Sequence, residues 1–280
     1  MRLRCGARTL DLSHPVVMGV LNVTPDSFSD GGKYLEPEAA VEHGLRMAAE
    51  GAAIIDVGGE STRPGAAPVP VEEELRRVMP VIEALAGALA GSGVVISVDT
   101  SKPEVIAAAA AAGAGLINDI RALSVPGALE AVAATDCAVC LMHMQGEPST
   151  MQLAPRYENV VDEVRTFLLE RVRHCRTVGV SADRIVIDPG FGFGKTLEHN
   201  LELLRRLEEL TGTGWPVLVG LSRKSMIGRL LGERPADERL HGSVALAVIS
   251  AMKGARIVRA HDVAATVDAL KMVSAVQAGG

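Results

Sequence analysis

The side chains best suited to chemistry in this sequence each follow a short apolar run of residues. Three of them, Asp99, Asn118 and Asp188, supply two carboxylate acceptors and one amide that both donates and accepts hydrogen bonds. Such a set suits a flat heterocycle that presents several N–H groups. The sequence therefore indicates a small polar site for a ring of this kind.

Cationic side chains gather after the last two apolar runs, at Arg223, Lys224, Arg259 and His261. Arginine and lysine are good ligands for phosphate oxygens. The chain as a whole is nevertheless acidic, with 28 Lys and Arg against 34 Asp and Glu and a formal charge of −6. Cations concentrated at one place in an acidic protein favour an anionic leaving group over a polyanion.

The apolar runs predict eight buried β-strands, each followed by a longer segment. The runs cover residues 16–21, 53–57, 94–98, 115–117, 138–142, 184–187, 217–221 and 255–258, and the main amphipathic segments cover residues 38–50, 71–89, 103–112, 157–178, 197–210, 243–253 and 263–276. Nearly continuous apolar strands are typical of a parallel sheet that is covered on both faces. Eight such units predict the α/β class and a (β/α)8 TIM barrel, with a doubly wound open sheet as the alternative.

A TIM barrel also explains where the polar residues stand. Catalytic groups in this architecture lie at the C-terminal ends of the strands, so the residues that follow the eight runs should gather at one mouth. Residues 1–13 are expected to form a β-hairpin that closes the barrel floor. Residues 14–280 are expected to form the barrel, in a single domain.

Two polar, glycine-rich segments, residues 22–32 and 58–65, are longer than a loop between strand and helix needs to be. We interpret them as lids that close over the mouth. Phe28 supports this interpretation, because a lone aromatic side chain in a polar loop usually has something to cover.

Several other functional classes fit the composition poorly. The chain has 4 Phe, 2 Tyr and 1 Trp, too few for platforms on which single-stranded nucleic acid stacks. Its negative charge disfavours nucleic acids and anionic membranes as partners. No secretory signal is visible near Met1, so a cytoplasmic location is expected.

Two motifs are interpreted as misleading. Cys137 and Cys140 form a C-x-x-C pair, but no second pair completes a zinc site, and both lie in an apolar run. We expect buried, structural cysteines. Residues 190–196 resemble a phosphate-binding P-loop, but Pro189 occupies the position that requires its first glycine.

Long segments of the chain resemble one known family, dihydropteroate synthase. The matching segments are NVTPDSFSDGG at 22–32, GGESTRPGA at 58–66, SVDTSK at 97–102, IND at 117–119, LMH at 141–143, DPGFGFGK at 188–195, LSRKS at 221–225 and VRAHDV at 258–263. They occur in the family's order over nearly the whole chain. The resemblance implies an enzyme of folate biosynthesis that joins 6-hydroxymethyl-7,8-dihydropterin pyrophosphate to p-aminobenzoate and releases pyrophosphate.

The family pattern also implies roles for individual residues. The pterin ring would be held by Asp99, Asn118, Asp188 and Lys224, with Met142 and Phe193 packed near it. The pyrophosphate would be bound by Arg259 and His261, by Arg63 when the second lid closes, and by Asn22 through Mg²⁺. The p-aminobenzoate pocket would be formed by Phe28, Thr62, Pro64, Lys224 and Ser225.

The reaction implied by the resemblance is a dissociative, SN1-like substitution. Asp99 and Asp188 would stabilise the pterin cation, while Mg²⁺, Arg259 and His261 would stabilise the departing anion. Together with Lys224, these four side chains are the expected catalytic residues. A pterin-dependent methyltransferase and a non-catalytic pterin-binding paralogue are the alternatives, and the family resemblance suggests a homodimer.

Overall fold

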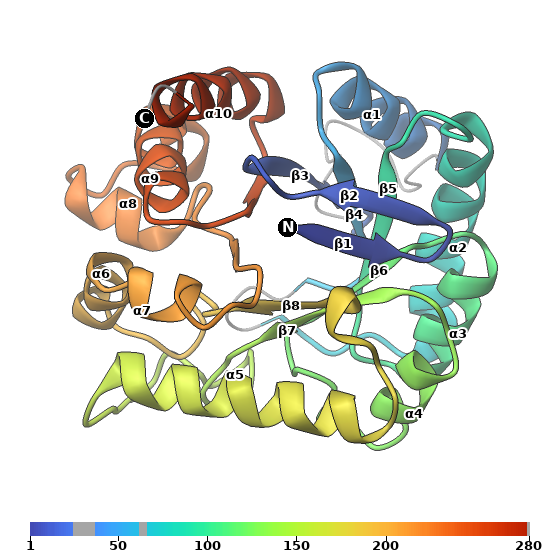
Figure 1. The fold of residues 1–280 in the computed structure, drawn as a ribbon, viewed down its shortest axis with the longest axis horizontal. Helices are drawn as coiled ribbons and strands as arrows, with labels where there is room; N and C mark the ends of the chain where they lie inside the picture. The colour runs from blue at the N-terminus through green and yellow to red at the C-terminus, as the bar shows by residue number, and fades with distance from the viewer. Residues whose placement is uncertain (25–36, 62–65, 279–280) are drawn as a thin grey trace.

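The computed structural model describes residues 1–24, 37–61 and 66–278 of the protein. Eight parallel strands curl into a nearly closed barrel (Figure 1), in the order β8-β7-β6-β5-β4-β3-β10-β9. Their bounds are β3 Val16–Asn22, β4 Ile54–Gly58, β5 Val95–Asp99, β6 Leu116–Asp119, β7 Ala138–Met142, β8 Ile185–Asp188, β9 Leu218–Val219 and β10 Ile257–Ala260. A parallel bridge from Ile187 to Val217 links the two ends of the sheet. The predicted TIM barrel is confirmed, and the open sheet was the wrong alternative.

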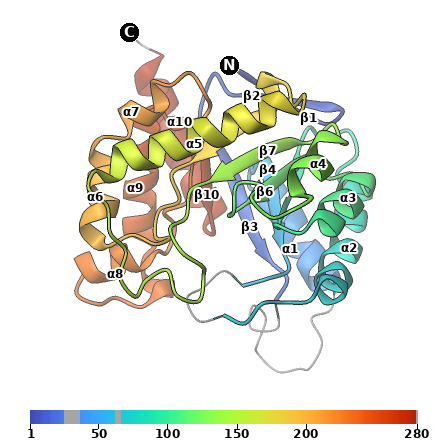
Figure 2. The same cartoon turned by 90° about the horizontal axis from the view of Figure 1, so that it is seen from below.

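Helices surround the barrel, as Figures 1 and 2 show from two directions. Their bounds are α1 Pro37–Ala49, α2 Val71–Ala88, α3 Pro103–Ala111, α4 Ala128–Ala133, α5 Val160–Thr177, α6 Leu197–Arg205, α7 Glu208–Thr211, α8 Ser225–Leu230, α9 Leu240–Met252 and α10 Val263–Gln277, with 3-10 turns η2 Ala182–Arg184 and η3 Ala236–Glu238. None of the helices in the described ranges is long and apolar enough to cross a membrane.

The helices differ from the sequence prediction at two places. The predicted helix over residues 197–210 is broken into α6 and α7. Leu203, Leu207 and Leu210 are buried on both sides of the break, so the apolar period continues through it and suggested one helix. The short α4 was not predicted, because six residues after Gly127 are too few to show a helical period.

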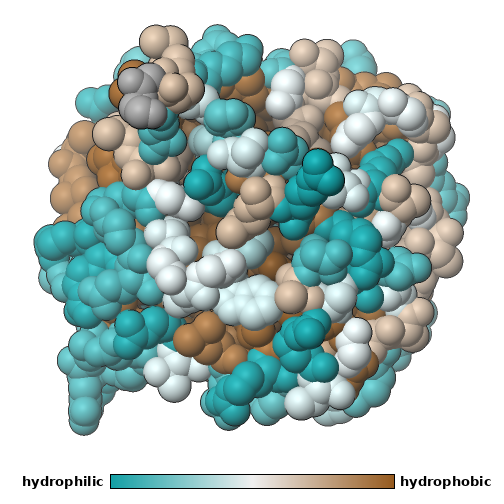
Figure 3. Space-filling view, viewed as in Figure 1, coloured by the Kyte–Doolittle hydropathy of each residue, from teal (hydrophilic) through white to brown (hydrophobic). Residues whose placement is uncertain are grey.

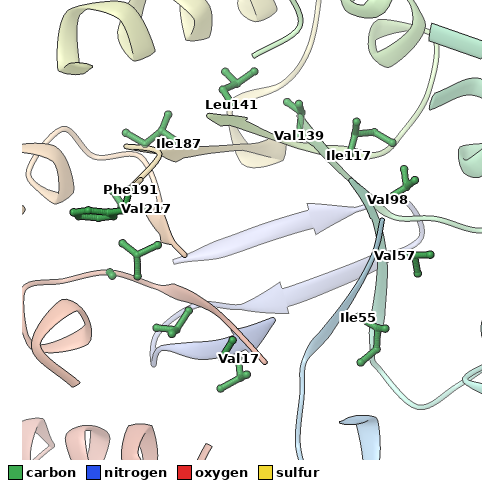
Figure 4. Close-up of a cluster of buried hydrophobic side chains, with 14 of the residues drawn as sticks. Val17, Ile55, Val57, Val98, Ile117, Val139, Leu141, Ile187, Phe191 and Val217 are labelled. Atoms are coloured by element: carbon green, nitrogen blue, oxygen red, sulfur yellow. The ribbon is translucent and has the colours of Figure 1, made fainter. Parts of the chain in front are cut away.

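Alternate residues of each strand face opposite sides of the barrel wall. Outward-facing side chains such as Val57, Val98 and Ile117 belong to the main core between strands and helices, and Figure 4 shows them pointing away from the barrel centre. Inward-facing side chains such as Met18 and Ile54 form a second buried cluster. The half of the barrel interior that lies toward the N-terminal ends of the strands is therefore a packed core.

The predicted floor hairpin is present as β1 Arg2–Cys5 and β2 Arg8–Asp11, which pair antiparallel. Leu3 and Leu10 of the hairpin pack against the inward-facing cluster. This end of the barrel faces the viewer in Figure 1, and Figure 3 shows from the same side that polar and apolar side chains cover it. The floor is thus closed by the chain itself.

The four cysteines are free and buried, as predicted for the C-x-x-C pair. Burial raises the pKa of the Cys140 thiol well above its usual value, and the carboxylates of Asp188 and Asp56 act in the same direction. Cys140 is therefore a protonated interior side chain rather than a reactive thiolate.

Candidate active site

The predicted site residues lie at the C-terminal end of the barrel, opposite the hairpin. The strand register aligns, from β3 through to β6, Asn22, Gly58, Asp99 and Asn118. On the other side of the mouth, Met142 of β7 is paired with Asp188 of β8. The parallel register alone therefore brings residues from distant parts of the sequence to one edge of the sheet.

Arg259 of β10 lies between two carboxylates inside the barrel. Its Nε donates to Oδ2 of Asp56 at 2.7 Å, and its Nη2 donates to Oδ2 of Asp99 at 3.1 Å. The guanidinium is mostly buried, and Asp56 has no exposed surface. The predicted acceptor Asp99 and the predicted cation Arg259, which the sequence assigns to two different groups of side chains, are therefore in direct contact.

Asp56 was not among the residues selected from the sequence. It occupies the middle of β4 and also accepts a hydrogen bond from Nδ2 of Asn118 at 3.0 Å. The sequence feature that could have identified Asp56 is its position as a carboxylate inside the otherwise apolar run 53–57. Burying a charge without a partner is costly, so such a residue is expected to have a specific partner.

Two site carboxylates have raised pKa values. Burial raises the pKa of Asp99 to about 7, against the opposing effect of Arg259. Burial also raises the pKa of Asp188 to about 6, although the N–H of Gly190 and the Lys224 ammonium favour its charged form. Both groups hence change charge close to neutral pH, which is typical of functional sites.

Lys224 lies over an aromatic ring at the mouth. Its Nζ is 4.1 Å from the centre of the Phe193 ring, a cation–π contact. Burial and nearby Arg259 lower the pKa of Lys224 to about 8. Phe193 also belongs to a buried cluster with Met142, Ile120 and Met151. The structure thus brings together the predicted Lys224, Phe193 and Met142 as one partly apolar wall.

The loop after β8 is held in place by Lys195, which sequence reasoning did not select. Its buried Nζ donates to the carbonyls of Gly190 and Phe193 at 3.0 Å each and lies 2.9 Å from Nδ1 of His143. Burial lowers the pKa of Lys195 to about 7. The lysine of the apparent P-loop is therefore used inside its own loop, in agreement with the rejection of that motif.

His261 is held by a serine of the preceding strand–helix loop. Its backbone N–H donates to Oγ of Ser222 at 3.2 Å, and its Nδ1 lies 3.0 Å from the same oxygen. Burial, with Arg259 and Arg223 nearby, lowers the pKa of His261 to about 3. The imidazole is therefore neutral at pH 7, and the prediction from the sequence that His261 is one of the cations is wrong.

Arg223 makes a bidentate ion pair with Asp262, through Nη2 at 2.6 Å and Nε at 3.2 Å. The charge of Arg223 is thus largely neutralised by Asp262.

The predicted p-aminobenzoate residue Ser225 is the first residue of α8, directly after Lys224. The predicted lid residues Phe28, Thr62, Arg63 and Pro64 lie outside the described residues.

Comparison with known proteins identifies what this site resembles. Residues 18–261 match the model of the pterin binding enzyme family. The dihydropteroate synthase of Escherichia coli (strain K12) is 58% identical over 275 residues, which cover 98% of this chain and 96% of that protein. The enzyme of Mycobacterium leprae (strain TN) is 46% identical and covers 95% of each chain.

Solved structures agree with these sequence matches. The Yersinia pestis dihydropteroate synthase in a sulfonamide drug complex superposes with a TM-score of 0.93 at 53% identity and covers 99% of this chain and 100% of that one. The Xanthomonas albilineans enzyme with 4-aminobenzoic acid has a TM-score of 0.92 at 56% identity, covering 99% and 98%. A further structure of the Xanthomonas enzyme contains 7,8-dihydropteroate. The chain belongs to the pterin-binding enzyme family and, within it, to the dihydropteroate synthases.

Proposed function

We propose that this protein joins 6-hydroxymethyl-7,8-dihydropterin pyrophosphate to p-aminobenzoate, giving 7,8-dihydropteroate and pyrophosphate. The observation that carries the proposal is the contact between acidic and basic side chains at the barrel mouth, where Arg259 meets Asp99 beside Asn118. High identity to dihydropteroate synthases over nearly the whole chain supports the same reaction.

The carboxylates and the amide of the mouth suit the pterin ring. Asp188 already accepts the N–H of Gly190 at 2.7 Å through Oδ1, which leaves Oδ2 to accept N–H groups of a ligand. Asp99 and Asn118 are adjacent across β5 and β6 and add further acceptors. The apolar wall of Met142 and Phe193 would pack against the ring face, below Lys224.

Arg259 and His261 would bind the pyrophosphate. Burial acts to lower the pKa of Arg259, but the Asp56 and Asp99 carboxylates outweigh it and raise this pKa, so the guanidinium stays charged at all working pH values. His261 is neutral and can donate an N–H to an oxygen of the anion without adding charge. A fixed cation and a fixed neutral donor stabilise a leaving group without reorganising during the reaction.

We also propose that the protein uses Mg²⁺, held by Asn22. A Cβ built on Gly58 would lie 3.6 Å from Oδ1 of Asn22 and 3.9 Å from Oδ2 of Asp99. The glycine therefore keeps open a space beside hard oxygen donors, which are the ligands that Mg²⁺ prefers. Asn22 would hold the ion, whose chemistry when bound is to stabilise negative charge on pyrophosphate oxygens.

The chemical step breaks the bond between the pterin methylene carbon and the pyrophosphate oxygen and forms a bond to the p-aminobenzoate nitrogen, which loses a proton. We propose a dissociative, SN1-like course, since a dihydropterin can carry positive charge after the anion departs. The carboxylates of Asp99 and Asp188 would stabilise that charge, and Ser225 with Lys224 would bind the second substrate.

An assay of pyrophosphate release tests this function. The purified protein is expected to release one pyrophosphate for each dihydropteroate formed, and release should stop when p-aminobenzoate is omitted or EDTA removes divalent cations. Sulfonamides should compete with p-aminobenzoate. A methyltransferase or a non-catalytic pterin-binding protein would release no pyrophosphate, so that result would contradict the proposal.

We also propose that two copies of the chain associate through α8, α9 and α10. Large apolar side chains are exposed on these helices at Leu230, Ile249, Met252, Met272 and Val276. Figure 3 shows apolar surface at its upper left, over α9 and α10. An exposed apolar patch of this kind typically marks a protein interface. Separately, we propose a cytoplasmic location, which the four free cysteines support because disulfides are rare in reducing compartments.

Light scattering after gel filtration tests the association. The wild-type protein should have about twice the 29.3 kDa mass of one chain, whereas a double substitution Ile249→Asp and Met252→Asp should give single chains, because it places charge in the apolar patch. Leu153→Asp is the matched control, since Leu153 is equally apolar and 82% exposed but lies in the loop before α5. A monomeric wild type would contradict the proposal.

A further inference from the structure

A buried carboxylate beneath the mouth has no role in the reaction described above. Asp56 is fully buried, and its Oδ2 accepts hydrogen bonds from both Arg259 and Asn118. Its other oxygen, Oδ1, has no hydrogen-bond partner among the described residues. Buried oxygens without partners are rare and costly, so packing alone gives little reason for an aspartate at this position.

We propose that Asp56 is a positioning residue, which determines the atoms of Asn118 and Arg259 that face the substrates. This inference rests on the function proposed above. A carboxylate accepts hydrogen bonds but cannot donate them. Asn118 must therefore turn Nδ2 toward Asp56, and its Oδ1 becomes the atom offered to a ligand.

The consequence for Asn118 is substrate selectivity. With Oδ1 toward the ligand, Asn118 recognises a ring edge that donates N–H groups and disfavours an edge that presents only acceptors. In the opposite amide orientation, two oxygens would face each other at the 3.0 Å separation that now joins Nδ2 and Oδ2. Asp56 thus selects a heterocycle with N–H donors, such as the pyrimidine part of a pterin.

The consequence for Arg259 is a fixed direction of the guanidinium plane. Asp56 binds Nε, and Asp99 binds Nη2. Within the part of the chain that the structure describes, Nη1 has no hydrogen-bond partner. Its two N–H groups remain for an oxygen of the pyrophosphate, and a guanidinium held at two points presents them in one orientation.

A double-mutant cycle with Asn118 tests this role. Asp56→Leu removes the shared acceptor at similar volume and is expected to weaken binding of a pterin without phosphate by ~10-fold in calorimetry, about the effect of one lost hydrogen bond. In an Asn118→Ala background the same change should cost less than about 3-fold, because coupled residues are not additive. Asp56→Asn retains one acceptor oxygen and should recover most of the affinity. If Asp56→Leu does not fold, Asp56→Ala replaces it in the cycle.

Ser97→Ala is the matched control. Ser97 is the neighbour of Asp56 across β5, is equally buried, and its Oγ also has no partner among the described residues. This variant should bind the pterin with unchanged affinity. Equal losses from Asp56→Leu in both backgrounds, or no recovery in Asp56→Asn, would overturn the positioning role alone. Unchanged affinity in Asn118→Ala would overturn the proposed pterin site together with it.

Discussion

Asp188→Asn is expected to lower the affinity for a pterin by ~100-fold or more. The buried Asp188 carboxylate accepts the Gly190 N–H on one oxygen and has the other for ligand N–H groups. Hydrogen bonds to a charged acceptor contribute roughly 1.5–3 kcal/mol each, and an amide would place N–H against N–H. Calorimetry with a pterin that lacks phosphate measures the effect. Asp183→Asn, on the floor beside Arg4, should leave affinity unchanged; full affinity in Asp188→Asn would remove Asp188 from the site.

The pH dependence of pterin binding tests whether the charge of Asp188, and not only its shape, is needed for binding. Because burial raises the pKa of Asp188 to about 6, its carboxylate becomes protonated as the pH falls from 7 to 5, and binding should weaken over that range. Asp188→Asn should lose this step and keep only the one from Asp99, whose pKa is raised to about 7.

The raised pKa of Asp188 affects folding stability in the opposite direction, so that stability falls as the pH rises. The folded state holds the Asp188 proton more tightly, so its contribution to the free energy of unfolding decreases between about pH 4 and pH 6 as the pH rises.

The barrel and most of its mouth could be predicted because they depend on local patterns. A parallel strand that is buried on both faces must be apolar, and its first polar residue marks where it reaches solvent. Asp99 and Asp188 stand at such strand ends. Once the runs were identified, the geometry of a barrel brought these residues together.

The residues that sequence reasoning missed depend on contacts between distant strands. Asp56 lies inside a strand, where its importance comes from Arg259, 203 positions later in the chain. The neutral state of His261 results from burial and two neighbouring guanidinium groups, which no sequence pattern reports. Lys195 is used by carbonyls of its own loop. Partners and burial, rather than residue type, determine these three roles.

Arg259→Ala is expected to weaken binding of the pterin pyrophosphate by ~100-fold or more, and to affect a pterin without phosphate much less. The guanidinium is the buried cation that we assign to the pyrophosphate, and charged hydrogen bonds of this kind are among the strongest. The measurement is a comparison of the two ligands by calorimetry. Arg256→Ala is the control on the same segment, because Arg256 binds the carbonyl of Ser13 at the floor. Equal losses for the two ligands would contradict the assignment of Arg259.

The same substitution should also destabilise the fold in a pH-dependent way. Removing one partner of a buried ion pair typically costs about 3–5 kcal/mol, and Arg259→Ala leaves the carboxylates of Asp56 and Asp99 without their cation. Protonation of a carboxylate relieves that cost, so thermal unfolding should show a smaller loss at pH 6 than at pH 8. Arg259→Lys retains the positive charge but not the planar guanidinium with its fixed N–H directions. It should recover most of the stability, because any cation between the two carboxylates offsets their charge. It should recover little of the preference for pyrophosphate, because that preference depends on N–H groups held in one direction.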